Sequence, residues 1–139
     1  MSDDAIRAAV RELYDAYAQR DFTRVAALIH DDIDWIIYAP VTVFPFAGAR
    51  RGRAAVLQAM GGIAEQYAIV SYTPEVIIVE GNHAAVMSDT AFRQRATDRV
   101  LRFRIANFHR FQDGKIIEFR EFLNSFDAVE QALGRDIEL

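Results

Sequence analysis

Hydrophobic and polar positions predict helices in the first half of this chain and strands in the second. In residues 3–20, apolar side chains recur every three or four positions, the spacing of one helix face: Ile6, Val10, Leu13, Tyr14 and Tyr17. Asp21 is a suitable N-cap for a second, short helix through Ile29. From residue 67 onward, the chain is strand-like throughout.

The segment between the second helix and residue 67 combines a strand, an unusual loop and a helix. Residues 31–38 have the composition of a short strand, and residues 53–66 predict a third helix. Residues 39–48 contain two prolines and two phenylalanines, so this stretch breaks regular structure while it remains apolar. Because loops normally lie on the surface, we expect an apolar loop of this kind to close over an apolar space.

Turn residues divide the second half into four strands. The turns are Gly81-Asn82, Thr97-Asp98 and Asp113-Gly114, and they separate strands over residues 67–80, 83–96, 99–111 and 115–124. Pro74 indicates an edge strand or a bulge. Short turns make this an antiparallel meander, and a last short helix is expected over residues 126–133. The chain therefore predicts one α+β domain, residues 1–139, in which about three N-terminal helices cover one face of a sheet.

The predicted turns decide which side chains share a face of the sheet. A two-residue turn at Thr97-Asp98 places Phe92 opposite Phe103, and a three-residue turn ending at Gly114 places Asn107 opposite Phe119. Partners across strands share a face, so the more apolar face should hold Ser88, Thr90, Phe92, Phe103, Ile105, Asn107, His109, Ile117, Phe119, Glu121 and Leu123. The other face is rich in arginine, with Arg93 expected opposite Arg102, and carries Phe108 and Phe122.

Three polar residues on the apolar face are candidates for catalysis. An apolar wall would raise the pKa of the Glu121 carboxyl toward neutrality, as general acid/base catalysis requires. Asn107 could polarise a ligand carbonyl, and His109 could carry protons near neutral pH. Each also has a structural interpretation: Glu121 held by Thr90, Asn107 or a tyrosine hydroxyl; Asn107 bonded to Ser88 in the core; and His109 at a solvated rim near the turn.

Aromatic and aliphatic residues would form the wall of a pocket for a small apolar or aromatic molecule. Tyr14, Tyr17 and Trp35 offer flat surfaces and polar donors for a ring-bearing ligand, although the same residues also suit plain core packing. Asp34 and Tyr38 flank Trp35 on the opposite face. The predicted substrate-binding residues are Tyr14, Tyr17, Trp35, Ser88, Thr90, Phe92, Phe103, Ile105, Phe119 and Leu123.

Composition and charge narrow the classes of function. The chain has no cysteine, which excludes disulfides, thiolate nucleophiles and zinc–sulfur sites. His30, His83 and His109 lie on separate elements without ligand spacing, so we expect neither a metal site nor a cofactor. The net charge of −4 argues against a nucleic-acid partner. Apolar runs too short for a bilayer and an acidic N-terminus argue against membrane association and a signal peptide, which suggests a cytoplasmic protein.

Three stretches of the chain resemble a known superfamily. The first begins at Asp21-Phe22 and continues to residues 31–35, the second is residues 45–53, and the third is residues 109–116. Their order and spacing, over nearly the whole chain, resemble the nuclear transport factor 2-like superfamily, and within it the SnoaL-like and ketosteroid-isomerase-like proteins. The resemblance implies a curved antiparallel sheet around a cone-shaped pocket, usually in a homodimer.

The resemblance also implies positions for catalytic residues. Ketosteroid isomerases use a tyrosine, a basic aspartate and a protonated aspartate, which match Leu13, Ile37 and Asn107 here. Only Asn107 could still donate a hydrogen bond to an oxyanion. The Arg–Asp–Asp set of limonene epoxide hydrolases falls on Thr90, Phe92 and Glu121, of which only Glu121 is a carboxylate. SnoaL-type cyclases need one acid/base, which Glu121 or His109 could supply.

Three functions remain open at this point. The first is a cofactor-independent isomerase, cyclase, dehydratase or hydrolase that acts on a small apolar carbonyl compound. The second is a non-catalytic binder of small apolar or aromatic ligands. The third is a dimerisation module with a filled interior. A raised pKa for Glu121 would favour catalysis, and the arginine-rich face favours a homodimer.

Overall fold

The helices begin where the sequence supplies caps. In this computed structural model, which describes residues 1–139, α1 (Asp3–Ala18) begins after Ser2, whose hydroxyl accepts a hydrogen bond from the Ala5 N–H at 3.1 Å. The Asp21 carboxylate likewise caps α2 (Phe22–Ala27) through the Arg24 N–H at 3.2 Å. Side-chain caps therefore fix both helix starts, and Asp21 is the cap predicted for α2.

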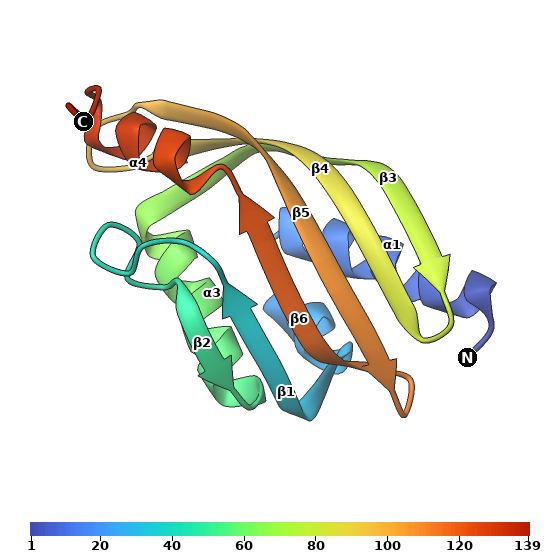
Figure 1. The fold of residues 1–139 in the computed structure, drawn as a ribbon. Coiled ribbons are helices and arrows are strands. Elements are labelled where there is room, and N and C mark those ends of the chain that lie inside the picture. Colours follow the sequence, from blue (N-terminus) through green and yellow to red (C-terminus); the bar gives the residue numbers. More distant parts are fainter.

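Six strands form one sheet in the order β2-β1-β6-β5-β4-β3. The remaining elements are β1 (Ile29–Ile37), β2 (Gly48–Arg51), α3 (Arg53–Gln66), β3 (Tyr67–Glu80), β4 (His83–Gln94), β5 (Val100–Gln112), β6 (Lys115–Leu123) and α4 (Ser125–Leu133). Figure 1 shows β6 and β5 at the centre of the sheet, with β2 and β3 at its edges. The predicted α+β class with a meander is confirmed.

Two features of the sheet differ from the sequence prediction. β2 was not predicted: the sequence assigned a loop to residues 39–48 and no element to residues 49–51. Its four residues pair antiparallel with β1, from Arg51 opposite Asp34 to Gly48 opposite Ile37. β1 joins the meander through β6, and this pairing is parallel. The sheet is therefore antiparallel except at the β1–β6 pair, which the long connection between these strands allows.

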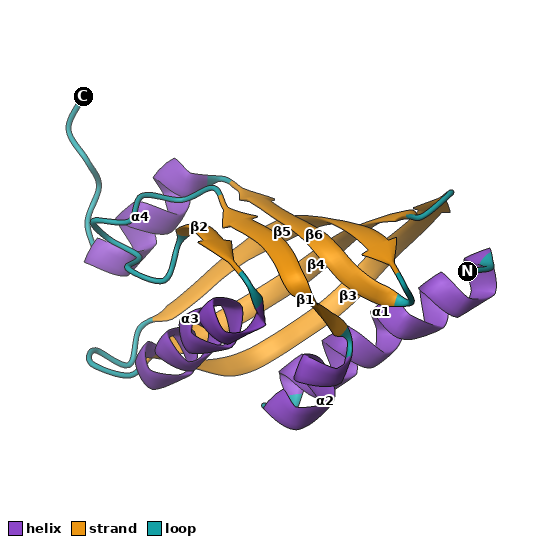
Figure 2. Ribbon diagram, turned by 90° about the horizontal axis from the view of Figure 1, so that it is seen from below, coloured by secondary structure: helices purple, strands orange, loops and turns teal.

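The helices α1, α2 and α3 lie on one side of the strongly curved sheet (Figure 2). α1 contacts β3 and β4, while α3 contacts β1, β2 and β3. The core between them contains the buried side chains of Ile6 and Val10 from α1 and Val56 from α3. The inner face of the sheet, which meets the helices, is the face predicted to be apolar. No helix is long and apolar enough to span a membrane.

Both central hairpins are offset by two residues from the predicted register. Phe92 lies opposite Leu101, because residues 95–99 connect β4 to β5 in place of a two-residue turn. Asn107 lies opposite Glu121, because the turn before β6 is one residue shorter than predicted and Ile117 adds a bulge. In the β4–β5 pair and beyond the bulge the offset is even, which keeps each side chain on its predicted face. Between the turn and the bulge it is one residue, so Ile116, and not Ile117 as predicted, is buried opposite Phe111 on the inner face.

The expected opposition of Arg93 and Arg102 is wrong. Arg93 lies opposite Val100 and forms an ion pair with Asp98 at 2.9 Å. Arg102 lies opposite Ala91, and its backbone N–H and C=O bind the Gln131 side chain of α4. The like-charge pair that favoured a second subunit on this face is therefore absent.

Candidate active site

A cavity of about 110 Å³ lies between the inner face of the sheet, α1, α3 and the loop that follows β1. All but two of its lining residues are hydrophobic. It is lined by Leu13, Tyr14, Tyr17, Trp35, Ile37, Ala39, Phe44, Phe46, Met60, Ile63, Tyr67, Tyr72, Phe92, Leu101, Phe103, Ile105, Asn107, Phe119, Glu121 and Leu123. The hollow therefore combines an apolar wall with a small polar group.

The apolar loop of residues 39–47 forms one side of this cavity, as its composition predicted. Phe44 is buried, Phe46 packs edge-on against Tyr67, and both line the hollow. Backbone bonds within the loop and the bond from Arg50 to the Pro45 carbonyl hold its shape. Phe44 is thus shielded from water and Phe46 is half-buried, although both lie in a loop.

Glu121 is the only carboxylate among the residues that line the cavity. It lies directly opposite Asn107 in the β5–β6 pair, and the Asn107 Nδ2 group donates a hydrogen bond to Glu121 Oε1 at 3.0 Å. No cationic side chain lines the cavity. One carboxylate oxygen is therefore fixed by a neutral donor, and Oε2 makes no hydrogen bond within the protein.

Burial controls the protonation of this carboxyl group. Removal from water raises the pKa of Glu121 to about 7, and the hydrogen bond from Asn107 offsets only part of this effect. Burial also raises the pKa values of the Tyr14 and Tyr72 hydroxyls well above their ordinary value, with smaller contributions from neighbouring groups that include Glu121. Near neutral pH, Glu121 can thus both accept and return a proton, while both tyrosines stay protonated.

Two tyrosines hold the amide of Asn107 from the other side. The Asn107 Oδ1 atom accepts hydrogen bonds from the hydroxyls of Tyr14 at 2.7 Å and Tyr72 at 3.4 Å. These bonds leave one hydrogen of the Nδ2 group without a partner in the protein. Asn107 is therefore bonded to Glu121 and the tyrosines, and not to Ser88 as one interpretation of the sequence had it.

His109 lies behind this group rather than in it. The Tyr14 hydroxyl is 2.9 Å from His109 Nε2. Because the single Tyr14 hydrogen is donated to Asn107 Oδ1, His109 Nε2 carries the hydrogen and donates it to Tyr14. His109 is 1% exposed, and burial lowers its pKa to about 4. A solvated rim position for His109 is therefore wrong, and its ring does not line the cavity.

Most of the residues proposed from sequence do line the cavity. Glu121 and Asn107 do so together with Tyr14, Tyr17, Trp35, Phe92, Phe103, Ile105, Phe119 and Leu123. Ser88 and Thr90 do not, although both are buried on the inner face. The Thr90 hydroxyl donates to the Phe103 carbonyl, and Ser88 Oγ is enclosed without a partner. Neither hydroxyl is placed to contact a ligand in the hollow.

Tyr72 is the polar lining residue that the sequence did not indicate. Strict alternation along β3 would place Tyr67 and Tyr72 on opposite faces. The register shifts between Ile69 and Ser71, so both tyrosines face inward. Proline at position 74 indicated irregularity in this strand, but nothing in the sequence located the shift.

Comparison with known proteins agrees with this geometry. The family model described as SnoaL-like domain matches residues 10–119. Among curated proteins, none matches the chain. A proposed isomerase from Rhodopseudomonas palustris is similar in structure, with 38% identity, 97% of this chain and 100% of that chain covered, and a TM-score of 0.85.

More distant solved structures share the fold. An NTF2-like protein from Burkholderia xenovorans LB400 is 25% identical, with 95% and 98% of the two chains covered and a TM-score of 0.81. An LEH-like epoxide hydrolase from M. tuberculosis is 18% identical, with 94% and 90% covered and a TM-score of 0.75. The resemblance inferred from the sequence is confirmed, and the chain belongs to the SnoaL-like domain family within the NTF2-like fold.

Proposed function

We propose that this chain is a cofactor-independent isomerase that moves a proton within a small, mostly apolar carbonyl compound, with Glu121 as the acid/base. The observation that carries the proposal is a lone carboxylate with a pKa of about 7 in an apolar cavity. The 38% identical relative described as a proposed isomerase supports the same class of reaction.

The proposed reaction uses the unbonded oxygen of Glu121. Glu121 Oε2 takes a proton from the carbon next to the substrate carbonyl, and the electron pair of that C–H bond moves into the carbonyl to give an enolate. The protonated carboxyl, which can exchange its proton with solvent, then returns one proton to a different carbon of the conjugated system, so no other reactant is consumed. The free Asn107 N–H is the candidate donor to the enolate oxygen.

Proton exchange with solvent tests this proposal without knowledge of the natural substrate. The protein is incubated in D₂O with small β,γ-unsaturated and α,β-unsaturated ketones, and deuterium uptake and double-bond migration are followed by NMR. Glu121→Gln should lower the rate by roughly 10²–10⁴-fold. The wild-type rate should rise with pH around a midpoint near 7, because the base must be ionised.

Glu118→Gln is the matched control. Glu118 lies on the same strand but on the outer face, where it contacts Arg110 and Arg120. Its substitution should leave exchange unchanged. Equal exchange rates in wild type and Glu121→Gln would overturn the assignment of Glu121.

A non-catalytic binder is the second candidate function. It is favoured by the absence of a second acid/base group from the cavity lining, since His109 is enclosed behind Tyr14. A ligand that raises the melting temperature of the protein but undergoes no exchange would support this alternative.

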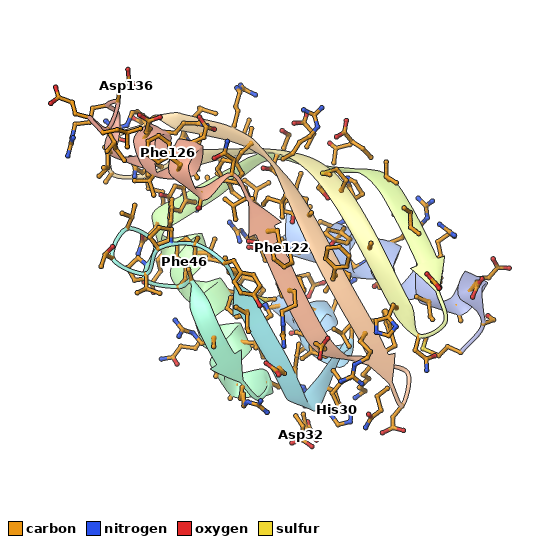
Figure 3. The ribbon with its side chains drawn as sticks, in the orientation of Figure 1. His30, Asp32, Phe46, Phe122, Phe126 and Asp136 are labelled. Carbon is orange, nitrogen blue, oxygen red and sulfur yellow. The ribbon has the colours of Figure 1, made fainter.

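We also propose that the protein forms a homodimer through the outer face of the sheet. Tyr38 stacks on Phe122 with ring centroids 4.7 Å apart, and Phe108 meets Phe122 edge-on at 5.9 Å. All three rings are exposed, and Figure 3 shows Phe122 on the face away from the helices. A contiguous, exposed aromatic patch on this face suits contact with a second copy of the chain.

A further inference from the structure

We propose that the cavity takes a neutral molecule with one ring and short substituents, about ten non-hydrogen atoms in all, whose single carbonyl or hydroxyl oxygen lies against Glu121. This inference deepens the proposed function and rests on Glu121 being its acid/base. It follows from three properties of the hollow: its volume, the charges around it and the arrangement of its rings.

The volume sets the size of the ligand. The cavity holds about 110 Å³. One water-sized sphere occupies roughly 10–15 Å³, so the space suits about ten non-hydrogen atoms. A single six-membered ring with a short branched substituent meets this limit, whereas a fused four-ring skeleton exceeds it.

The charges around the cavity favour a neutral ligand. Glu121 is the only ionisable lining group apart from tyrosines, and no arginine, lysine or histidine lines the hollow. The Arg20 guanidinium lies over the Tyr17 ring, 5.2 Å from its centroid, and donates a hydrogen bond to the Tyr67 carbonyl. Arg20 thus contacts two lining residues without lining the hollow itself. A carboxylate ligand would lose its water and meet another carboxylate. An ammonium ligand would have to give up its water and keep Glu121 fully ionised in an apolar hollow, and the desolvation cost of such a buried ion pair exceeds its attraction.

The rings of the lining offer flat surfaces to a ligand. Trp35 stacks on Phe119 with 15° between the ring planes, and Phe92 stacks on Phe103 with 26° between them. Trp35 is 2% exposed, and its Nε1–H has no partner in the protein. This nitrogen is enclosed, so the indole offers its flat face to the ligand, and the ligand oxygen lies by Glu121 and the free N–H of Asn107.

A set of matched probes tests size and charge by calorimetry and thermal shift at pH 7. The neutral ring compounds are an isopropyl-substituted cyclohexenone and p-isopropylbenzaldehyde. The charged counterparts of nearly equal size are p-isopropylbenzoate and p-isopropylbenzylamine, and the large probe is a four-ring steroid ketone. We expect the two neutral ring compounds to bind at least about tenfold more tightly than each of the others.

Two substitutions test whether the cavity volume decides this ranking. Ala39→Leu adds bulk to the lining and should weaken binding of the cyclohexenone by about tenfold or more. Ala49→Leu, on the exposed position of β2, adds the same bulk outside the cavity and should change nothing. Phe103→Leu, which enlarges the hollow, should improve binding of a two-ring ketone relative to the one-ring ketone.

The outcomes separate this inference from the proposed function. Steroid, benzoate or benzylamine binding as tight as that of the neutral ring compounds would overturn the inferred ligand class, even if Glu121-dependent exchange is observed. Equal effects of Ala39→Leu and Ala49→Leu would also overturn it. Conversely, the expected ranking without exchange in any probe would reject the proposed reaction while the ligand class stands.

Discussion

Glu121, which is half-buried, and His109, which is fully buried, share the inner face of the sheet, and loss of water shifts their pKa values in opposite directions. The Glu121 carboxyl holds its proton up to about pH 7, against 4.5 for an ordinary glutamate. The His109 imidazole stays neutral down to about pH 4, against 6.5 for an ordinary histidine. Between pH 4.5 and 6.5, Glu121 is protonated and His109 is neutral in the folded chain. In the unfolded chain Glu121 is ionised and His109 is protonated, so both states carry one proton on this pair of residues.

These opposite shifts predict compensating effects of pH on stability. Glu121 alone would lower the free energy of unfolding as pH rises from 4.5 to about 7, because only the unfolded chain has released the proton. His109 alone would lower it as pH falls from 6.5 to about 4, because only the unfolded chain binds the proton. The two contributions cancel where the windows overlap.

Single substitutions should expose each half of this compensation. Relative to wild type, Glu121→Gln should gain about 3 kcal/mol of stability as pH rises across the Glu121 window. His109→Gln should lose a similar amount, about 3 kcal/mol, as pH rises across the His109 window. Urea denaturation at a series of pH values measures both differences. Curves for the variants that run parallel to wild type would show that these groups titrate normally in the folded protein.

Tyr14 connects His109 to Asn107, so removal of its hydroxyl leaves His109 Nε2 without a partner and Asn107 Oδ1 with only the longer bond from Tyr72. We expect Tyr14→Phe to lower the free energy of unfolding by about 1–3 kcal/mol, although the ring itself is retained. Tyr38→Phe removes an exposed hydroxyl and should change stability by less than about 0.5 kcal/mol. Equal costs for the two substitutions would mean that the buried bonds contribute nothing.

At the scale of single residues, the sequence predicted the face of a side chain better than its contacts. Alternation placed Glu121 and Asn107 inward together, and both line the cavity. Alternation also placed Ser88 and Thr90 inward, but it carries no information about depth, and these two side chains are enclosed by the sheet. His109 was expected near solvent because it is close to a turn in sequence, yet α1 covers it through Tyr14.

At the scale of elements, two glycines show how backbone conformation decides the effect of the same substitution. Gly61 lies inside α3 with open space around its Cα, whereas Gly81 adopts φ +58° in the turn between β3 and β4. We expect Gly61→Ala to raise the free energy of unfolding by about 0.5–1 kcal/mol, since alanine restricts the unfolded chain and suits a helix. Gly81→Ala should lower it by about 1–2 kcal/mol, because the left-handed conformation strains a Cβ atom. Thermal unfolding of both variants measures the contrast, and a loss of stability in both would contradict it.

Turn signals located the strands of the meander but not their register. Asp113-Gly114 and Thr97-Asp98 marked the right places for turns, yet the β4–β5 connection uses residues 95–99 and Ile117 forms a bulge. Turn length depends on hydrogen bonds such as Gln94 N–H to the Arg99 carbonyl, which composition does not specify. β2 escaped prediction because its four residues are mostly arginine and glycine and derive their strand conformation from pairing with β1.

At the scale of the whole molecule, the outer face of the sheet is the surface proposed to join two copies. Phe122 and Phe126 are both 45% exposed, but Phe122 lies within the aromatic patch and Phe126 lies on α4 (Figure 3). At micromolar concentration, wild type should sediment as a dimer and Phe122→Lys should shift toward monomer, because a charge would be buried in the interface. Phe126→Lys should remain dimeric. Monomeric wild type would reject the proposed dimer.

The parallel pairing of β1 with β6 links assembly of the cavity to the order in which the chain is made. Ile37 of β1 lies beside Glu121 of β6, and both line the cavity. These two residues are more than eighty positions apart in the sequence, so the ribosome adds the second long after the first. At a synthesis rate of about 5–20 residues per second, β6 is made several seconds after β1. A chain that stops before Lys115 lacks the strand that joins β1 to the meander, so folding of this protein should be completed only after release of nearly the whole polypeptide.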